Sequence, residues 1–203
     1  MEFAYALLPD FPRPPKELTS VVPYSQALIK EDGSSIHEVG TYYQMTQMRD
    51  GKLMKCSSPA SIIDKKIDGW LKENIPIIQD WKDTRVNYYI PMEDTCDSIG
   101  VHTDKSKDYI LIYNIDIGGP DACLTFWQEC GQPLVREKGL IVEDSSLLDK
   151  KYEIVGPIDC WYLINSRVLH SVEKVTKPRI NIQISMYDHQ AIDLLKHLNC
   201  WYP

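Results

Sequence analysis

The chain has 203 residues, the size of one domain or of one domain with an appended subdomain. Hydrophobic residues make up 43% of it, enough for a sizeable core, and no apolar run approaches the length of a membrane span. The formal net charge is −7 and no extended run of Lys or Arg is present, which argues against a surface for duplex or long single-stranded nucleic acid. The start of the chain does not look like a signal peptide, so we expect a cytoplasmic protein without membrane attachment.

The six cysteines are scattered, and none forms a Cys-x-x-Cys pair. Their even number would allow disulfides, but the absence of a secretion signal favours free, buried thiols.

The first 83 residues contain an arm, two strands and a helix. Four prolines within the first fifteen residues predict an extended arm, which we place at 1–35. Residues 36–48 and 52–56 are predicted strands, joined by the turn Arg49-Asp50-Gly51. Ser58 as cap and Pro59 at the first helical position then predict a helix. Its apolar stripe would pack on a sheet and consists of Ile63, Ile67, Trp70 and Leu71.

From residue 84 onward, short strands alternate with Gly and Pro turns, a pattern that indicates a sandwich or barrel. A helix at 188–198 follows. Residues 129–151 form the least regular stretch, and we interpret this segment, together with the arm before residue 35, as shaping the substrate pocket. We therefore predict one domain, 1–203, in which strands and a supporting helix (36–83) precede a core (84–187) and a C-terminal helical segment (188–203). The predicted core strands are 84–91, 98–103, 107–115, 122–128, 152–155, 159–165, 168–174 and 178–187.

The most informative side chains are His102 and Asp104, in the string IGVHTDKSKDY, and His170, in RVLHSVEKV. Positions i and i+2 of a strand point the same way, so His102 and Asp104 would reach one metal ion while Thr103 points away. Two histidines and one carboxylate can occupy one face of an octahedral iron(II) ion and leave the other positions open. A lone His-x-Asp is common by chance, and it is the later histidine that makes the pattern informative.

A second signal follows at Arg179, nine positions after His170 (179 − 170). Polar residues alternate with apolar ones from this point, so that Arg179, Asn181, Gln183 and Ser185 share one strand face. The polar face would lie in water on a half-exposed strand, or it would line a cavity; the histidine just upstream favours the cavity. Arg179 is then placed to bind a carboxylate that enters the open metal positions.

These residues, preceded by the run RVNYYIP at 85–91, resemble the 2-oxoglutarate/iron(II)-dependent oxygenases. The likeness covers residues 84–187 and is greatest to the branch that includes plant flavonoid and hormone oxygenases and isopenicillin N synthase relatives. It implies a mainly β fold: a double-stranded β-helix (jelly-roll, cupin-like) core with a few supporting helices. It also implies that His102, Asp104 and His170 hold the iron and that Arg179 pairs with the distal carboxylate of 2-oxoglutarate.

The resemblance further implies that Asn87 and Tyr89 contact 2-oxoglutarate near the metal. The plant pattern has a serine two residues after the arginine, where this chain has Asn181, whose amide can also donate to a carboxylate. The prolyl hydroxylase branch is similar as well: Tyr113, followed by Gly118 and Gly119, is a further candidate for a 2-oxoglutarate contact. A core tyrosine on a strand is the equally weighted alternative for Tyr113.

The activity that the resemblance implies is a dioxygenase with iron(II), 2-oxoglutarate and dioxygen, which ascorbate can stimulate. Such an enzyme hydroxylates its substrate through an iron(IV)-oxo species and releases succinate and carbon dioxide. We expect a small molecule, an amino acid or a peptide side chain as substrate. Three alternatives stay open: a jelly-roll module that binds without catalysis, a zinc hydrolase, and a nucleic-acid demethylase. Zinc hydrolysis would not explain Arg179, and the charge disfavours the demethylase.

Overall fold

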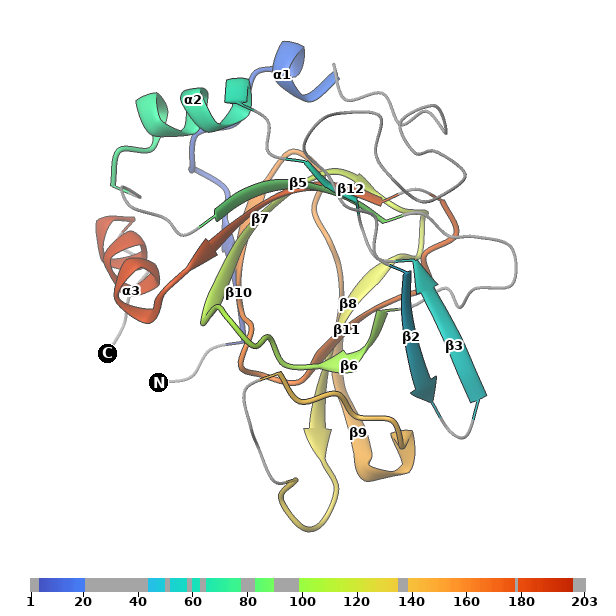
Figure 1. Ribbon diagram of the computed structural model, residues 1–203. Coiled ribbons are helices and arrows are strands. Elements are labelled where there is room, and N and C mark those ends of the chain that lie inside the picture. Colours follow the sequence, from blue (N-terminus) through green and yellow to red (C-terminus); the bar gives the residue numbers. More distant parts are fainter. Residues whose placement is uncertain are drawn as a thin grey trace.

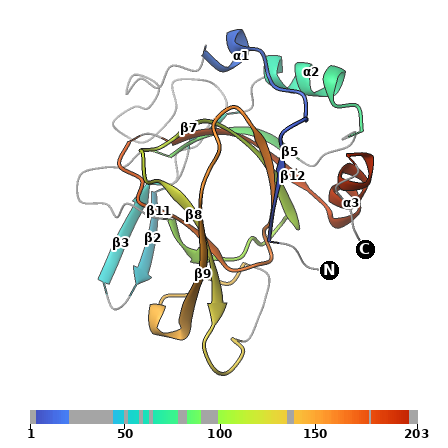
Figure 2. The same cartoon turned by 180° about the vertical axis from the view of Figure 1, so that it is seen from behind.

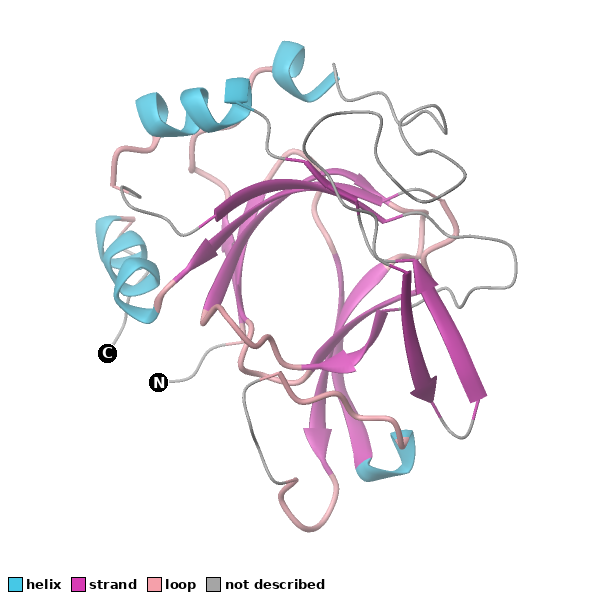
Figure 3. Cartoon of the chain, viewed as in Figure 1, coloured by secondary structure: helices cyan, strands magenta, loops and turns pink. Residues whose placement is uncertain are grey.

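The computed structural model describes residues 4–20, 44–49, 52–57, 60–62, 65–77, 83–89, 99–134, 139–177 and 179–198. Strands dominate this part of the chain (Figure 3). In chain order the elements are β1 (Tyr5–Leu8), α1 (Lys16–Ser20), β2 (Gln44–Arg49), β3 (Lys52–Ser57), β4 (Ala60–Ile62), α2 (Lys65–Asn74), β5 (Asp83–Tyr89), β6 (Ile99–His102), β7 (Tyr109–Ile117), β8 (Cys123–Glu129), η2 (Ser145–Leu147), β9 (Leu148–Val155), β10 (Trp161–Asn165), β11 (His170–Glu173), β12 (Arg179–Met186) and α3 (Asp188–His197).

Two antiparallel sheets face each other and form the body of the protein (Figure 1). The larger sheet has the strand order β1-β10-β7-β12-β5-β4, and the smaller one has the order β6-β11-β8-β9. From β5 to β12 the chain crosses repeatedly between the sheets, so that sequential strands are mostly not neighbours. This is the connectivity of a double-stranded β-helix, and it confirms the predicted jelly-roll class. A separate pair, β2–β3, makes a small hairpin sheet.

Period-2 alternation gives the larger sheet two buried faces. On β7, Ile110 and Ile112 pack between the two sheets, whereas Leu111 and Tyr113 belong to the cluster on the outer face. The helices α2 and α3 cover that outer face, as the view from behind also shows (Figure 2). The apolar positions of β12 face these helices: Ile180, Ile182, Ile184 and Met186. The polar positions of β12 therefore point into the sandwich.

The helix predicted from Ser58 begins later than expected. Residues 60–62 form β4, which pairs with β5, and α2 starts at Lys65. Pairing at a sheet edge satisfies the backbone groups of this segment, and this long-range gain outweighs the local helix signal. Ile67 and Leu71 of α2 are buried on the outer face of the sheet, as the stripe predicted. Ser58, Pro59 and Ile63 lie outside the described residues.

The predicted extended arm is corrected for residues 4–20. β1 is the edge strand beside β10, and α1 is a short helix. The Trp161 indole donates a hydrogen bond to the carbonyl of Pro12 at 2.7 Å, which ties the arm to the core. The four prolines all lie between β1 and α1, and within residues 5–20 it is this segment that has no regular secondary structure. Residues 21–43, including the first part of the strand predicted at 36–48, are not among the described residues.

The stretch predicted as irregular, 129–151, is partly structured. β9 begins at Leu148 and pairs with β8, so the strand predicted at 152–155 starts four residues earlier (152 − 148). Exposed polar residues obscure the alternation at the start of this edge strand. Residues around Ile141 run beside β6: the amide of Val142 donates to the carbonyl of Val101 at 2.9 Å. Backbone bonds therefore hold part of this stretch against the strand that carries His102.

Candidate metal centre

His102 and His170 come together because β6 and β11 are antiparallel neighbours. The two residues are direct cross-strand partners, and their ring centroids are 4.5 Å apart. His170 is also the cross-strand partner of Phe126, whose side chain packs between the sheets. Since opposite residues of an antiparallel pair share a face, His170 points into the sandwich. Its side chain is buried, with 4% of the residue exposed.

Asp104 lies two residues after the end of β6 and completes a cluster of donor atoms. One ligand atom from each of His102, Asp104 and His170 can be chosen so that all lie within 4.8 Å of one another. The Asp104 amide donates to the carbonyl of Ser166 at 2.9 Å, which fixes the loop after β6. Thr103 points the other way, and its hydroxyl accepts from the amide of Leu140 at 3.1 Å. The alternation His-x-Asp therefore separates two candidate ligands from an anchoring residue.

Backbone carbonyls set the orientation of both imidazole rings. His102 Nδ1 lies 2.7 Å from the carbonyl of Gly100, and His170 Nδ1 lies 2.8 Å from the carbonyl of Val168. A carbonyl only accepts, so each Nδ1 is the donor, and in a neutral ring Nε2 is then the nitrogen with a free lone pair. A second hydrogen bond of this kind is what orients metal-binding histidines in general.

The electrostatics of the cluster suit a cation. Burial, followed by the proximity of His102, lowers the pKa of His170 to about 4, so its ring is neutral at pH 7. Asp104 Oδ2 lies 3.8 Å from His170 Nε2 and is buried without a hydrogen-bond partner among the described residues. A buried acceptor left without a partner costs about 1–3 kcal/mol. A metal ion bound to this oxygen and to the histidine nitrogens would remove that cost, so the donor set fits a divalent metal.

Arg179 is a buried cation that donates hydrogen bonds to neutral groups. It is 4% exposed, and its guanidinium donates to the carbonyl of Ile117 at 3.0 Å, to Asn114 Oδ1 at 3.3 Å and to the hydroxyl of Tyr162 at 3.1 Å. None of these three acceptors carries a negative charge. A buried charge is normally paired, so this guanidinium is suited to an anionic ligand.

Asn114 and Tyr162 belong to this group, and sequence reasoning missed both. The Tyr162 hydroxyl donates to Asn114 Oδ1 at 3.2 Å, and the Asn114 amide donates to the carbonyl of Pro157 at 3.0 Å. Burial raises the pKa of Tyr162, which keeps its phenol protonated. Asn114 lies on the same face of β7 as Ile110 and Ile112, which pack between the sheets. A polar residue on this otherwise apolar strand face was the sequence signal that could have identified Asn114 as a site residue.

Tyr113 lies on the opposite face of the same strand. It packs against Trp161 with ring centroids 5.1 Å apart, and its hydroxyl donates to Asp159 Oδ1 at 3.1 Å. The structure therefore does not bring Tyr113 together with Arg179, and the expected contact with 2-oxoglutarate is corrected to a role in the outer core. The physical reason is parity: adjacent residues of a strand point to opposite faces.

The other predicted residues lie on the strands around Arg179. Asn181 is buried and is the cross-strand partner of both Asn87 and Asn114. Tyr89 is the cross-strand partner of Arg179. The side chains of Asn87 and Tyr89 are not described, so the register alone places these residues beside the arginine.

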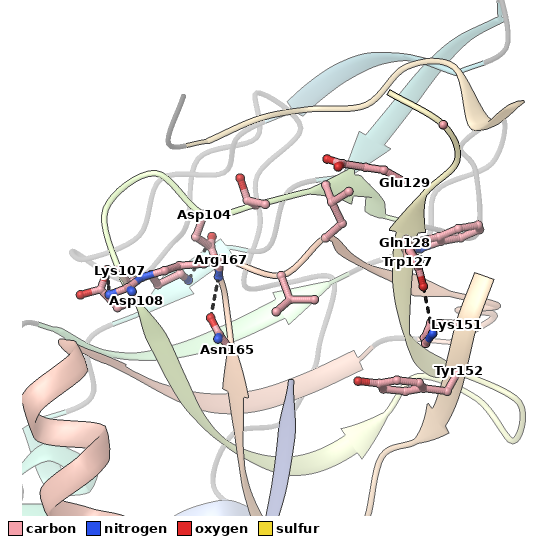
Figure 4. Close-up of a pocket in the computed structure, with 14 residues that line it drawn as sticks. Asp104, Lys107, Asp108, Trp127, Gln128, Glu129, Lys151, Tyr152, Asn165 and Arg167 are labelled. Atoms are coloured by element: carbon pink, nitrogen blue, oxygen red, sulfur yellow. Dashed lines mark hydrogen bonds and ion pairs between the residues drawn. The ribbon is translucent and has the colours of Figure 1, made fainter. Parts of the chain in front are cut away.

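A cavity of about 620 Å³ lies next to the candidate metal centre (Figure 4). Asp104, Lys107, Asp108, Asn165 and Arg167 line one side, and the end of β8 with the facing part of β9 lines the other (Figure 4). Gln128, Glu129, Gly131 and Lys151, on or beside the stretch 129–151, are among the lining residues. One metal-ligand candidate, Asp104, thus forms part of the wall.

Comparisons with known proteins find no matching family model and no matching curated protein. Among solved structures, the chain is similar to a 2OG-Fe(II) oxygenase family oxidoreductase from Burkholderia pseudomallei, at 9% identity and a TM-score of 0.49, over 90% of this chain and 84% of that one. It is also similar to a prolyl hydroxylase from Trichoplax adhaerens in complex with a hypoxia inducible factor peptide, at 9% identity and a TM-score of 0.45, over 92% and 84%.

A third match is the non-heme alpha ketoglutarate dependent epimerase SnoN of nogalamycin biosynthesis, at 10% identity and a TM-score of 0.42, over 73% of this chain and 67% of that one. These proteins are of the family that the sequence motifs resemble. Within the described part of the chain, no helix is long and apolar enough to cross a membrane.

Proposed function

We propose that this protein is a 2-oxoglutarate- and iron(II)-dependent dioxygenase that hydroxylates a polar small molecule, an amino acid or a peptide side chain. The observation that carries the proposal is the convergence of His102, Asp104 and His170. Their donor atoms lie within 4.8 Å of one another, both Nδ1 atoms lie against backbone carbonyls, and Asp104 Oδ2 has no hydrogen-bond partner within the described ranges.

Each of the three residues would hold the iron through one atom. The histidines would bind through Nε2, since Nδ1 is committed to a backbone carbonyl. The neutral state of His170 at pH 7 supports this role, because only a neutral imidazole can be a ligand. Bound iron would supply the activation of dioxygen, and the protein would contribute positioning and a site closed to water.

Arg179 would bind the distal carboxylate of 2-oxoglutarate. Its burial and its lack of an acidic partner among the described residues support this assignment, because the carboxylate would neutralise a charge that is otherwise compensated by neutral dipoles. Tyr162 and Asn114 would hold the guanidinium in place. Asn87, Tyr89 and Asn181 are proposed as further contacts from the neighbouring strands, on the strength of their register.

The cavity beside Asp104 is proposed as the substrate site. Its volume of about 620 Å³ is in the range of small-molecule pockets. Charged groups of both signs line it, which favours a polar substrate over an apolar one: Lys107, Lys151 and Arg167 against Asp104, Asp108 and Glu129. The predicted role of residues 129–151 in shaping this pocket is kept as part of the proposal.

The test is succinate formation from 2-oxoglutarate by the purified protein with iron(II) and ascorbate, beside the Asp104→Ala variant. We expect slow turnover without substrate, lost in the variant. Calorimetry with manganese(II) and 2-oxoglutarate provides the second readout. A protein that binds both but does not turn over still needs its substrate, whereas one that binds neither metal nor 2-oxoglutarate is not an oxygenase.

The same experiment separates the alternative functions. A binding module derived from this fold would take up a ligand without producing succinate. A zinc hydrolase would bind zinc but show no dependence on 2-oxoglutarate.

A further inference from the structure

The two oxygens of the Asp104 carboxylate have different surroundings. Oδ2 is buried, lies 3.8 Å from His170 Nε2 and has no hydrogen-bond partner in the part of the chain that the structure describes. Oδ1 lies 3.5 Å from the ammonium nitrogen of Lys107. One oxygen is thus directed toward the histidines, and the other toward a cation.

Lys107 is held beside Asp104 by the loop that carries both residues. The Asp104 amide donates to the carbonyl of Ser166, and the hydroxyl of Ser166 donates back to the carbonyl of Lys107 at 2.9 Å. The amide of Ser166 donates to the carbonyl of Asp108 at 3.0 Å. These bonds tie the loop 103–108 to the turn before β11. The side chain of Lys107 is only 19% exposed, so its ammonium group is not an ordinary surface charge.

We propose that Lys107 is a positioning residue that occupies Asp104 Oδ1 and so limits this carboxylate to one metal-binding oxygen. The inference rests on the proposed metal site. A carboxylate can bind a metal ion through one oxygen or through both. The ion pair of Lys107 with Oδ1 competes with the second mode, because the ammonium group would have to move away before this oxygen could bind the metal. In an octahedral site with three protein ligands, one-oxygen binding leaves three positions open, and two-oxygen binding leaves only two.

The number of open positions matters for the proposed reaction. A co-substrate that binds through two atoms, together with dioxygen, needs three positions. Lys107 would thus keep three positions of the metal open without itself contacting 2-oxoglutarate or dioxygen.

The test is a count of the water molecules on bound manganese(II). The full-length protein is titrated with manganese(II), and the water number is obtained from proton relaxation of the solvent. The variants are Lys107→Met, which removes the ammonium group at similar length, and Lys107→Arg, which keeps a cation. Lys105→Met is the matched control, because Lys105 is an exposed residue of the same loop.

We expect about three waters in the wild type, in Lys105→Met and in Lys107→Arg, and about two in Lys107→Met, so that the relaxation enhancement per bound ion falls by about one third. An equal water number in Lys107→Met and the wild type would overturn the proposal. If Lys107→Met binds no manganese(II), Lys107→Arg decides: binding with the wild-type water number supports the proposal, and lack of binding there contradicts it. Failure of the wild type to bind manganese(II) would instead reject the metal site itself.

Discussion

His102 and His170 are direct partners across two antiparallel strands, with their ring centroids 4.5 Å apart. This pairing brings two side chains of the ligand type together. The residue two positions after His102 then adds the carboxylate. The geometry of the candidate centre therefore follows from the pairing of β6 with β11.

The first prediction concerns two of the three proposed ligands, His102 and Asp104. His102→Ala and Asp104→Ala should each weaken manganese(II) or cobalt(II) binding by more than about 100-fold, since even the loss of an outer-shell partner costs about 10–100-fold. Calorimetry measures the affinity. His189→Ala is the control, because His189 is an exposed residue of α3. Equal affinity in His102→Ala and His189→Ala would exclude His102 as a ligand.

The second prediction concerns Arg179. Arg179→Met should raise the Kd for 2-oxoglutarate by about 30-fold or more, which corresponds to about 2–5 kcal/mol for a buried carboxylate that loses its partner. Arg179→Lys should lose less affinity for 2-oxoglutarate, because lysine keeps the positive charge but not the paired N–H donors of the guanidinium group. Arg13→Met serves as control, since Arg13 is an exposed residue between β1 and α1 and does not line the cavity. Unchanged 2-oxoglutarate affinity in Arg179→Met would defeat the assignment.

The third prediction separates two tyrosines on opposite faces of one sheet. Tyr162→Phe removes a hydroxyl that bonds both Arg179 and Asn114. We expect 2-oxoglutarate binding to weaken by about 2- to 13-fold, the equivalent of one hydrogen bond of about 0.5–1.5 kcal/mol. Tyr113→Phe, which removes the bond to Asp159, should leave the affinity unchanged. A larger loss in Tyr113→Phe than in Tyr162→Phe would contradict the arrangement proposed for this site.

The fourth prediction follows from the lowered pKa of His170, which is about 4 in the folded protein against 6.5 for an unperturbed histidine. Between these values the unfolded chain binds a proton that the folded chain does not, so the free energy of unfolding should decrease as the pH falls from about 6.5 to about 4. The loss attributable to this residue is about 3 kcal/mol. Urea unfolding of the metal-free protein at several pH values measures it. In His170→Gln the free energy of unfolding should vary less with pH between about 4 and 6.5. If this variant shows the pH dependence of the wild type, the loss of stability does not come from His170.

The fifth prediction concerns the glycine that lies against Arg179. Gly118 has a φ of +90°, and a Cβ placed there would lie 2.8 Å from the Cβ of Arg179 and 2.9 Å from Val175 Cγ1. Gly118→Ala should therefore lower the free energy of unfolding by well over about 1 kcal/mol. Gly131→Ala is the matched control, because Gly131 has a φ of +83° but a Cβ there would meet no atom of the described residues within 4 Å. Similar losses in both variants would show that only the backbone conformation matters.

Local patterns were enough to predict most of the core. Short apolar runs between Gly and Pro turns predicted β5 to β12, since a strand buried on one face or both shows its period directly. Alternation also predicted that Thr103 points away from Asp104. It placed the apolar residues of β12 on one face and Arg179 on the other. Such patterns are readable because they depend only on the geometry of a single strand.

Long-range pairing controlled the features that the patterns did not predict. The segment of β4 carries a helix signal but pairs with β5, and β1 closes the edge beside β10. The surroundings of Arg179 also depend on the assembled fold. Alternation along the strand shows that Tyr113 and Asn114 point to opposite faces of the sheet, but it does not show which face lies between the sheets. That depends on where the second sheet packs and on which side the helices cover. Tyr162, on a strand far from Arg179 in sequence, joins the site for the same reason, since burial and contact are set by the assembled sandwich and not by the chain alone.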